Sequence, residues 1–367
     1  MERETVLWLS PEALDHNFRF FKSRAGKTIR ILVNLKADAY GHGAVLIGKF
    51  LQHKTDYFSV AYANEGFQLR NAGISIPVLV FNPPTDPCRS FFEHRLEPVF
   101  YHTEQIRIYK QILVQLGINA YPVHLKLDSG MHRSGLPAAQ LDMAIKELKN
   151  PVFKLVSVYS HLAAADDPAE DSFTRKQISL FDRLSARVKQ DFPRVIRHLA
   201  NSAAAIRFPE AIYDMIRPGI GIYGYTTYEK AKNLLKPVAS LQSAITQIRE
   251  VDAGESVGYN RRFVATRKTR IALIPTGYGD GYFRLFGNGK AYVTIEGKPA
   301  PTIGTVSMDM LTVDITHIPQ ARIGSLVCIF GEKPSVYDLA QIARTIPYEI
   351  TTALHERVLR KWNDNFP

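Results

Sequence analysis

Lys36 stands where a lysine can become a nucleophile. It follows the run Ile29–Val33, which is mostly apolar and β-branched and is typical of a parallel strand buried on both faces. The glycines Gly41 and Gly43 come soon after it and predict a turn. Burial beside such a turn lowers the pKa of an amine, and the neutral amine can form a Schiff base with a carbonyl compound. The alternative for this residue is a lysine that extends from a strand end into solvent.

Other polar residues also stand at the ends of predicted strands. The residues of this kind are Lys36, Lys126, His161, the pair Asn201-Ser202, and Arg217. In a (β/α)8 barrel the carboxyl ends of all strands meet at one rim, and active sites lie there. Cationic and polar side chains from distant parts of the sequence would therefore converge.

The glycine-rich turn after the last of these strands suits a phosphate group, because barrels often bind phosphate in the loops after strands seven and eight. Backbone N–H groups at Gly219 and Ile220, with the hydroxyls of Ser202 and Tyr40, could donate to it. Taken singly, the Asn-Ser pair could cap a helix and Gly219 could serve a turn. Taken together, these residues favour a site for an anionic cofactor.

Strand-like and helix-like segments alternate in the first part of the chain. The strand candidates are Ile29–Lys36, Tyr57–Ala61, Val78–Phe81, Pro98–Tyr101, Val123–Asp128, Phe153–His161, Ile196–Ala200 and Tyr213–Arg217. Amphipathic segments include Gln105–Leu116, Ala138–Leu148 and Asp171–Lys189, and Ser10 before Pro11 predicts a helix start. This alternation predicts an α/β fold with a (β/α)8, TIM-like barrel. A doubly wound sheet is the alternative, but its glycine-rich dinucleotide fingerprint is missing.

From about residue 233 the pattern changes to strands separated by short turns. Val238–Val251 is long and strand-like, and one late helix is predicted near Val336–Thr345. Further strands are predicted at Arg270–Pro275, Ala291–Glu296, Leu311–Ile315 and Leu326–Phe330. We therefore predict a barrel domain over residues 1–232 and a mainly β domain over residues 233–367.

The composition favours a soluble protein over a nucleic-acid or membrane protein. The net charge of +11 comes without a polybasic tract or zinc-finger spacing, and the hydrophobic content of 46% supports full cores. Cys88 and Cys328 lie far apart and indicate neither a disulfide framework nor a zinc ribbon. No apolar run approaches the ~20 residues that span a bilayer, and the run Val6–Leu9 after Met1–Glu4 is too short for a signal peptide. We expect a cytoplasmic protein without a metal.

Segments spread over nearly the whole chain resemble the motifs of the alanine racemase family, in the family's order. These segments are Asn34–Gly43, Lys126–Gly135, His198–Ser202, Ile216–Ile220, Val257–Asn260, Gly277–Gly281 and Val306–Asp309. The first resembles the pyridoxal-phosphate attachment motif. The resemblance implies pyridoxal 5′-phosphate as cofactor and a homodimer with shared active sites. It also implies the interconversion of L-alanine and D-alanine by two bases, for peptidoglycan synthesis.

The resemblance implies roles for individual residues. Lys36 would hold the cofactor and serve the D face of the substrate α-carbon, and Tyr259 of the partner subunit would serve the L face. The cofactor-binding residues would be Lys36, Tyr40, His161, Asn201, Ser202, Arg217, Gly219 and Ile220. The substrate would contact Arg133, Tyr278 and Met308, and Lys126 would be carbamylated.

Arg217 would face the ring nitrogen of the cofactor. Because an arginine does not accept a proton, that nitrogen would stay unprotonated and the electron sink would be shallower. The substrate carbanion would then be reprotonated at the α-carbon rather than diverted into transamination. This arrangement suits a racemase.

The sequence departs from the family pattern at two places and leaves other functions open. Gly258 and Asn260 flank Tyr259 where serine and glycine are frequent, and Trp362 stands where a phosphate-binding tyrosine is usual. The alternatives are a broader amino-acid racemase, a basic amino-acid decarboxylase on the same barrel, or a non-catalytic pyridoxal-phosphate carrier. The β domain with Tyr259 and Tyr278 argues against the carrier.

Overall fold

The structure is a computed structural model that describes residues 5–363. Met1–Glu4, where the N-terminal prediction begins, and residues 364–367 lie outside the described part. The described chain forms two compact units. Residues 16–39 and 43–235 make up the barrel unit, and residues 5–15, 40–42 and 236–363 make up the β unit. No helix within residues 5–363 is both long enough and apolar enough to cross a bilayer.

The barrel unit is built on eight parallel strands in the order β8-β7-β6-β5-β4-β3-β2-β9. They are β2 (Arg30–Asn34), β3 (Tyr57–Val60), β4 (Val78–Val80), β5 (Leu96–Phe100), β6 (Tyr121–Lys126), β7 (Phe153–Tyr159), β8 (Ile196–His198) and β9 (Met215–Ile216). Flanking residues bring the two end strands together: Asp214 N–H donates to the Arg197 oxygen at 3.0 Å, and Arg217 N–H donates to the Ala200 oxygen at 2.9 Å. The predicted (β/α)8 barrel is therefore confirmed, nearly closed.

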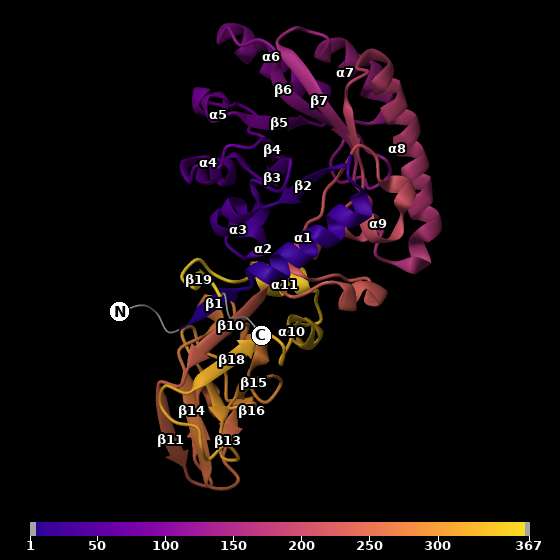
Figure 1. Cartoon of the computed structure of the whole chain (residues 1–367). Coiled ribbons are helices and arrows are strands. Elements are labelled where there is room, and N and C mark those ends of the chain that lie inside the picture. The colour runs from indigo at the N-terminus through magenta and orange to yellow at the C-terminus, as the bar shows by residue number, and fades with distance from the viewer. Residues whose placement is uncertain (1–4, 364–367) are drawn as a thin grey trace. The chain divides into compact units, whose positions relative to one another are not determined.

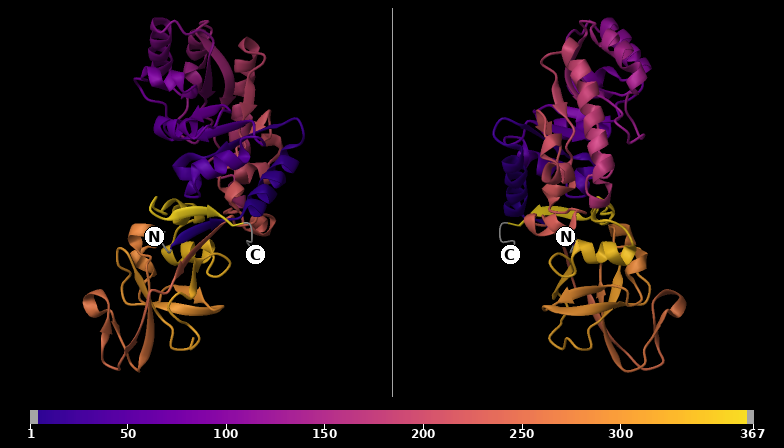
Figure 2. Two further views of the ribbon diagram at one scale, coloured as in Figure 1. Left: turned by 60° about the vertical axis from the view of Figure 1, so that its left-hand side comes forward. Right: turned by 90° about the vertical axis from the view of Figure 1, so that its right-hand side faces the viewer.

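Helices connect the strands, and α3 to α8 cover the outside of the barrel (Figures 1 and 2). The α-helices in this part of the chain are α1 (Pro11–Ala25), α2 (Lys36–Tyr40), α3 (Ala44–Leu51), α4 (Ala63–Asn71), α5 (Arg89–Glu93), α6 (Thr103–Gln115), α7 (Leu141–Leu148), α8 (Asp171–Asp191) and α9 (Ser202–Arg207). Short 3-10 helices are η1 (Ala138–Gln140), η2 (Pro168–Glu170), η3 (Pro209–Ala211), η4 (Ile220–Tyr223) and η5 (Glu229–Leu234). The predicted start of α1 is confirmed, because the Ser10 hydroxyl oxygen accepts from Ala13 N–H at 3.0 Å.

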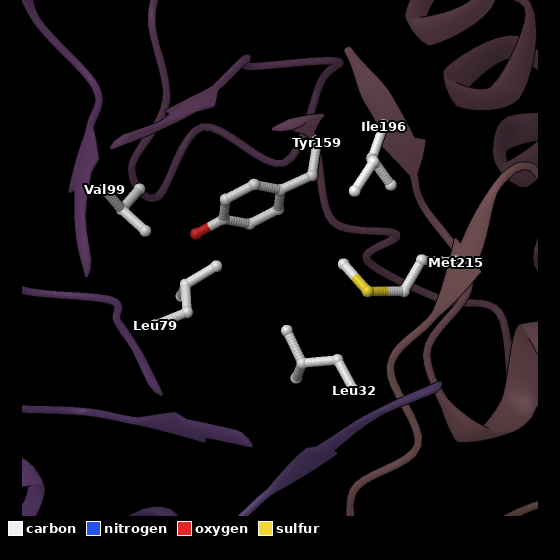
Figure 3. Packing of buried hydrophobic residues seen from close by; sticks show 6 residues of the cluster. All are labelled: Leu32, Leu79, Val99, Tyr159, Ile196 and Met215. Atoms are coloured by element: carbon white, nitrogen blue, oxygen red, sulfur yellow. The ribbon is translucent and has the colours of Figure 1, made fainter. Parts of the chain in front are cut away.

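The centre of the barrel is filled by side chains from alternate positions of its strands. One such cluster consists of Leu32, Leu79, Val99, Tyr159, Ile196 and Met215. Their side chains converge on a common centre in Figure 3. Successive side chains of a strand point to opposite faces, so alternate residues of each strand face the barrel interior. Because the interior is packed, chemistry that needs a ligand has to lie at the strand ends.

The β unit contains a nine-stranded sheet in the order β11-β14-β17-β16-β15-β18-β10-β1-β19. Its strands are β1 (Val6–Leu9), β10 (Ala239–Ala244), β11 (Gln247–Val251), β14 (Thr269–Ile274), β15 (Tyr292–Ile295), β16 (Lys298–Ile303), β17 (Leu311–Asp314), β18 (Leu326–Phe330) and β19 (Leu359–Trp362). A separate pair is formed by β12 (Ser256–Val257) and β13 (Phe263–Val264), and the helices are η6 (Tyr259–Arg261), η7 (Tyr278–Asp280), η8 (Arg284–Phe286), α10 (Val336–Ala343) and α11 (Pro347–Thr352). The predicted mainly β second part is confirmed. The boundary between residues 232 and 233 stays a prediction.

The structure corrects two details of the β unit. The single long strand predicted over Val238–Val251 is wrong, because β10 pairs with β1 and β18 whereas β11 pairs with β14. Both halves are equally strand-like, so propensity does not reveal the change of partner. The late helix predicted near Val336–Thr345 is confirmed as α10, but a second helix, α11, was not predicted, although it carries Pro347 in its first turn, a helix-start signal.

Candidate active site

Lys36 follows β2 and opens a turn with an unusual backbone. Ala37, Asp38, Ala39 and Tyr40 have φ angles between 51° and 55°, so the segment labelled α2 winds in the left-handed sense. Each non-glycine residue in this conformation costs about 1–2 kcal/mol. Strain of this size persists only where the surroundings hold it in place.

Two carboxylates hold this turn through backbone amides. Glu65 Oε1 accepts from Ala37 N–H at 2.6 Å, and Oε2 accepts from two amides at the start of α4, at 2.6 and 3.1 Å. Asp38 Oδ1 accepts from Ala44 N–H at 2.7 Å, at the start of α3. The strained turn is thus tied to both neighbouring helices.

The surroundings of Lys36 lower the pKa of its amine. Burial has the largest effect, the positive charge of Arg133 adds to it, and the negative charge of Glu65 opposes it. A larger share of the amine is therefore neutral at a given pH than for a lysine in water. The neutral form is the nucleophile.

Lys126, the last residue of β6, is a second lysine with altered chemistry. It is 8% exposed, and its pKa is lowered to about 8 by burial first and then by the charges of Arg133 and Arg217. Its Nζ donates to Ser134 Oγ at 2.5 Å. A sizeable fraction of this amine is neutral near neutral pH.

Arg133 is carried by a loop that Asp128 organises. Asp128 Oδ1 accepts from the N–H groups of Gly130, Met131 and His132 at 2.9, 3.1 and 3.2 Å. Burial raises the pKa of Asp128, but these hydrogen bonds outweigh burial and lower it. Arg133 is exposed and forms no hydrogen bond or ion pair with another described residue. Its guanidinium is available to an anion.

Arg217, just after β9, is 3% exposed and surrounded by acceptors. Nη1 donates to the carbonyl oxygen and to Nδ1 of His198, both at 2.9 Å. Nη2 donates to the carbonyl oxygens of Ser160 at 2.7 Å and Leu199 at 3.2 Å. Burial lowers the pKa of Arg217 to about 10, and Tyr159, whose ring centre lies 4.8 Å from the guanidinium carbon, opposes the shift. The Nε–H has no acceptor among residues 5–363.

His161 is held neutral between these cations. Its Nδ1 lies 3.4 Å from Nη2 of Arg217. Burial first, and then the charges of Arg217 and Arg133, hold the pKa of His161 well below its ordinary value. The ring therefore adds an aromatic surface to the site and no further positive charge.

The turn predicted to bind phosphate is organised by Ser202. Its Oγ accepts from two N–H groups of the glycine-rich turn, that of Gly219 at 2.9 Å among them, which leaves its own O–H to donate. The N–H of Ile220 has no acceptor within residues 5–363. Asn201 Oδ1 accepts from Ala204 N–H at 2.9 Å, so that oxygen is used to cap α9.

Positive charge exceeds negative charge where the barrel-unit residues meet. The charges of Arg133, Arg217 and Lys36 each lower the pKa of Lys126. The carboxylates that oppose them, Glu65 and Asp128, are already bonded to backbone amides. The strand ends therefore form a site that attracts an anion.

Besides Tyr40, three predicted site residues belong to the β unit. Tyr259, Tyr278 and Met308 are 68%, 43% and 54% exposed. Tyr278 N–H donates to the Ser307 oxygen at 3.1 Å, and the Thr305 hydroxyl donates to the Tyr259 carbonyl oxygen at 3.5 Å. The loops that carry these residues are thus linked through the segment 305–308.

Arg357 holds two of these loops in place, a role that the sequence did not reveal. It forms a bidentate pair with the buried Asp280 at 2.8 and 3.1 Å, and it donates to Asp309 Oδ1 at 2.8 Å and to the Met308 oxygen at 3.3 Å. Asp280 is 77 residues away in the chain, so no local spacing reveals the pair.

Tyr40 has an aromatic neighbour that the sequence also did not reveal. The rings of Tyr40 and Tyr348 in α11 lie 6.0 Å apart, and burial raises the pKa of Tyr40. Trp362, which stands where a phosphate-binding tyrosine was expected, lies in β19 and pairs with Leu9 of β1.

The fold and the site define a class of protein, a parallel (β/α)8 barrel whose strand ends carry a buried lysine of lowered pKa and an excess of positive charge. The chain belongs to the alanine racemase family. The model of the alanine racemase N-terminal domain matches residues 9–227, and the model of the C-terminal domain matches residues 238–362. The family resemblance of the motifs is confirmed, and membership makes the chain an isomerase.

Known proteins resemble the chain over nearly its full length. The alanine racemase of Alteromonas mediterranea is 36% identical over 365 residues, which cover 98% of this chain and 99% of that protein. The structure of the Clostridium difficile 630 enzyme matches with a TM-score of 0.94 at 31% identity and covers 100% and 97% of the two chains. The Bartonella henselae alanine racemase, solved with covalently bound pyridoxal phosphate, matches with a TM-score of 0.85 at 27% identity and covers 98% and 99%.

Proposed function

We propose that the protein interconverts L-alanine and D-alanine with pyridoxal 5′-phosphate held at the barrel site, and so supplies D-alanine for peptidoglycan. The observation that carries this proposal is the desolvated Lys36 amine near Lys126 and Arg133, where positive charge exceeds the opposing charges of Glu65 and Asp128. The cofactor offers an aldehyde to the amine and anionic groups to the cations. The bound pyridoxal phosphate of the Bartonella henselae relative supports the same assignment.

The described residues fit this cofactor. Lys36 would form the bond to its aldehyde carbon. The Nε–H of Arg217, which has no acceptor in the described part of the chain, would donate to its ring nitrogen. The O–H of Ser202 and the N–H of Ile220 are unused donors suited to its phosphate. The residues proposed to complete the cofactor site are Tyr40, His161, Asn201 and Gly219.

Racemisation needs a proton removed from one face of the α-carbon and returned to the other. When bound, pyridoxal phosphate supplies an electron sink for the negative charge at that carbon. Lys36 would move the proton on the D face, and the partner subunit's Tyr259 would move it on the L face. Arg217 cannot accept a proton, so it would leave the ring nitrogen of the cofactor unprotonated. The cofactor would then delocalise less of the negative charge at the α-carbon.

Arg133 would bind the substrate carboxylate, because a guanidinium matches a carboxylate with two parallel hydrogen bonds. A backbone group of Met308 and the side chain of Tyr278 would complete the substrate site. We propose that the neutral amine of Lys126 reacts with carbon dioxide to give a carbamate and a released proton. The carbamate would turn a like charge beside Arg133 into an opposite one.

The exposed aromatic and apolar side chains of the β-unit loops favour a homodimer with shared sites. Tyr259, Tyr278 and Met308 are all exposed, and their loops are linked through the segment 305–308, so a partner subunit could cover them together. A cytoplasmic location suits the two unpaired cysteines, which a reducing compartment keeps free.

The test follows alanine in deuterated water. The cofactor-loaded protein is incubated with L-alanine while the chirality and the deuterium at the α-carbon are measured together. We expect D-alanine that carries solvent deuterium. Exchange without inversion would remove the second base, and the absence of both signals would reject alanine as the substrate.

A further inference from the structure

A line of polar side chains crosses the inside of the barrel, where branched apolar residues usually pack. It runs from Arg217 through His198, Ser157 and His124 to Glu97, and each of these residues is at most 7% exposed. The separations are 2.9 Å from Arg217 Nη1 to His198 Nδ1, 2.7 Å from His198 Nε2 to Ser157 Oγ, 2.7 Å from Ser157 Oγ to His124 Nδ1, and 2.8 Å from His124 Nε2 to Glu97 Oε2. We call these five residues the interior chain.

The interior chain is built into the inward face of consecutive strands, β5 to β8, and the residue after β9. Side chains two positions apart on a strand share a face. Four members lie two positions from a residue of the central cluster in Figure 3, in the pairs Glu97 and Val99, Ser157 and Tyr159, His198 and Ile196, and Arg217 and Met215. A contiguous polar path through a packed core requires every hydrogen bond to be satisfied.

Arg217 determines where the protons of the interior chain lie. A guanidinium has donors only, so Nδ1 of His198 has to accept. Nε2 of His198 then carries the ring proton and donates to Ser157. The serine hydroxyl accepts on that side and donates to Nδ1 of His124, whose Nε2–H donates to Glu97. All donors point from the arginine toward the carboxylate.

No other proton arrangement satisfies the four contacts. If His124 were doubly protonated, Ser157 would have to donate to Nε2 of His198. The ring proton of His198 would then lie on Nδ1 and face the N–H of Arg217. A doubly protonated His198 meets the same conflict, and burial with the charge of Arg217 also holds its pKa well below the ordinary value.

We propose that Glu97 and His124 are positioning residues for Arg217. Acting through Ser157, they keep Nδ1 of His198 unprotonated, so that it accepts a hydrogen bond from Nη1 of Arg217. The second hydrogen of Nη1 is donated to the carbonyl oxygen of His198, so one residue binds both. The guanidinium is thereby held with Nε–H as its unused donor. The proposal rests on the role proposed above for Arg217 toward the cofactor.

The first measurement is the protonation of the two histidines in the cofactor-free full-length protein. Nitrogen-15 NMR of labelled histidine rings distinguishes the two neutral tautomers from the charged ring, and His124→Asn and His198→Asn variants assign the signals. We expect both rings to be neutral with the proton on Nε2, as the hydrogen bonds of the interior chain require. A charged ring, or a proton on Nδ1 of His198, would overturn the proposal.

The second measurement tests whether Glu97 acts at a distance. Glu97→Gln keeps the shape and an acceptor but removes the charge that polarises the interior chain. We expect the Nε2–H signal of His198 to move and kcat of the loaded enzyme to fall roughly 10- to 100-fold with little change in KM for alanine. Glu147→Gln is the control, because Glu147 pairs with Arg107 and Lys110 on the outer helices and should leave both readouts unchanged.

Ser157→Ala keeps the test decisive if Glu97→Gln folds poorly, because it removes one hydroxyl in the middle of the interior chain. With this link cut, adding Glu97→Gln should cause no further shift at His198. A shift that persists, or a Glu97→Gln variant that loses thermal stability without moving the His198 signal or kcat, would show a merely structural role. Failure of the wild-type protein to racemise alanine would contradict the proposed function and leave the tautomer prediction intact.

Discussion

Two lysines in one barrel acquire different chemistry from the residues around them. Burial lowers the pKa of both, and Arg133 lowers both further. Each lysine also faces one carboxylate, Glu65 for Lys36 and Asp128 for Lys126, but Lys126 faces a second guanidinium, that of Arg217, as well. These surroundings agree with the proposed roles, proton transfer for Lys36 and reaction with carbon dioxide for Lys126.

Replacing Glu65 with Gln should lower the pKa of Lys36 further, because the negative charge of Glu65 raises that pKa. The Lys36 amine of the cofactor-free protein would then be neutral down to a lower pH. The measurement is the rate of reductive methylation of Lys36 against pH, followed by peptide mass spectrometry. Glu12→Gln, an exposed carboxylate on α1, is the control. A midpoint that stays in place or rises would contradict the assignment.

Lys126 should take up labelled carbon dioxide in a pH-dependent way. Its pKa of about 8 lies below the ordinary 10.5, so the reactive neutral form increases as pH rises through about 8. Carbon-13 NMR of the native protein in labelled bicarbonate should show one slowly exchanging carbamate that is stronger at pH ~8.5 than at pH ~6.5. The Lys126→Met variant should lack it. A native wild-type protein without this signal would reject carbamylation.

At the scale of elements, the sequence predicts the strands better than the turns. All eight barrel strands were located because buried apolar runs end at polar residues, and period-two alternation brings Lys126 and Arg217 to one site. The left-handed turn Ala37–Tyr40 could not be predicted, since alanine rarely adopts positive φ and one aspartate does not signal four consecutive left-handed residues. Glu65 was missed for the same reason, because its role depends on that turn.

The roles assigned to Lys36, Tyr259 and their neighbours came from the family motifs, and they stay predictions. Spacing alone shows that such residues can converge on one strand-end rim. It does not show which of them contacts a cofactor, since Asn201 in the structure also caps a helix. Arg357 and the interior chain depend on partners far apart in the sequence, and only the fold brings these together.

The left-handed turn gives an element-scale prediction for Asp38. Asp38→Ala removes the acceptor for Ala44 N–H, so the cofactor-free protein should lose about 1 kcal/mol in free energy of unfolding by urea. It should also bind pyridoxal phosphate several-fold more weakly, because the turn after Lys36 loosens. Asp167→Ala removes a comparable cap from η2, where Asp167 accepts from Ala169 N–H at 2.9 Å. That control should lose similar stability and keep its cofactor affinity, and equal affinity losses in both variants would contradict the link.

At the scale of the whole molecule, the proposed catalytic pair divides between the two units of the chain. Lys36 lies in the barrel unit, and Tyr259 lies on an exposed loop of the β unit, where its side chain is 68% exposed. A base that works at a buried carbon has to be covered in the working enzyme. A second copy of the chain would provide that cover and would make each site depend on both subunits.

Mixing two inactive variants tests this dependence. Lys36→Ala and Tyr259→Phe homodimers should each be nearly inactive, but a hybrid dimer has one site that keeps both residues. After the subunits are reassorted in equal amounts, about a quarter of the wild-type number of sites should be intact, and activity should recover to about that level. Each variant reassorted with itself should recover nothing. If Tyr259 served its own subunit, every site in the mixture would lack one residue and no activity would return, so recovery directly measures whether Tyr259 acts across the interface.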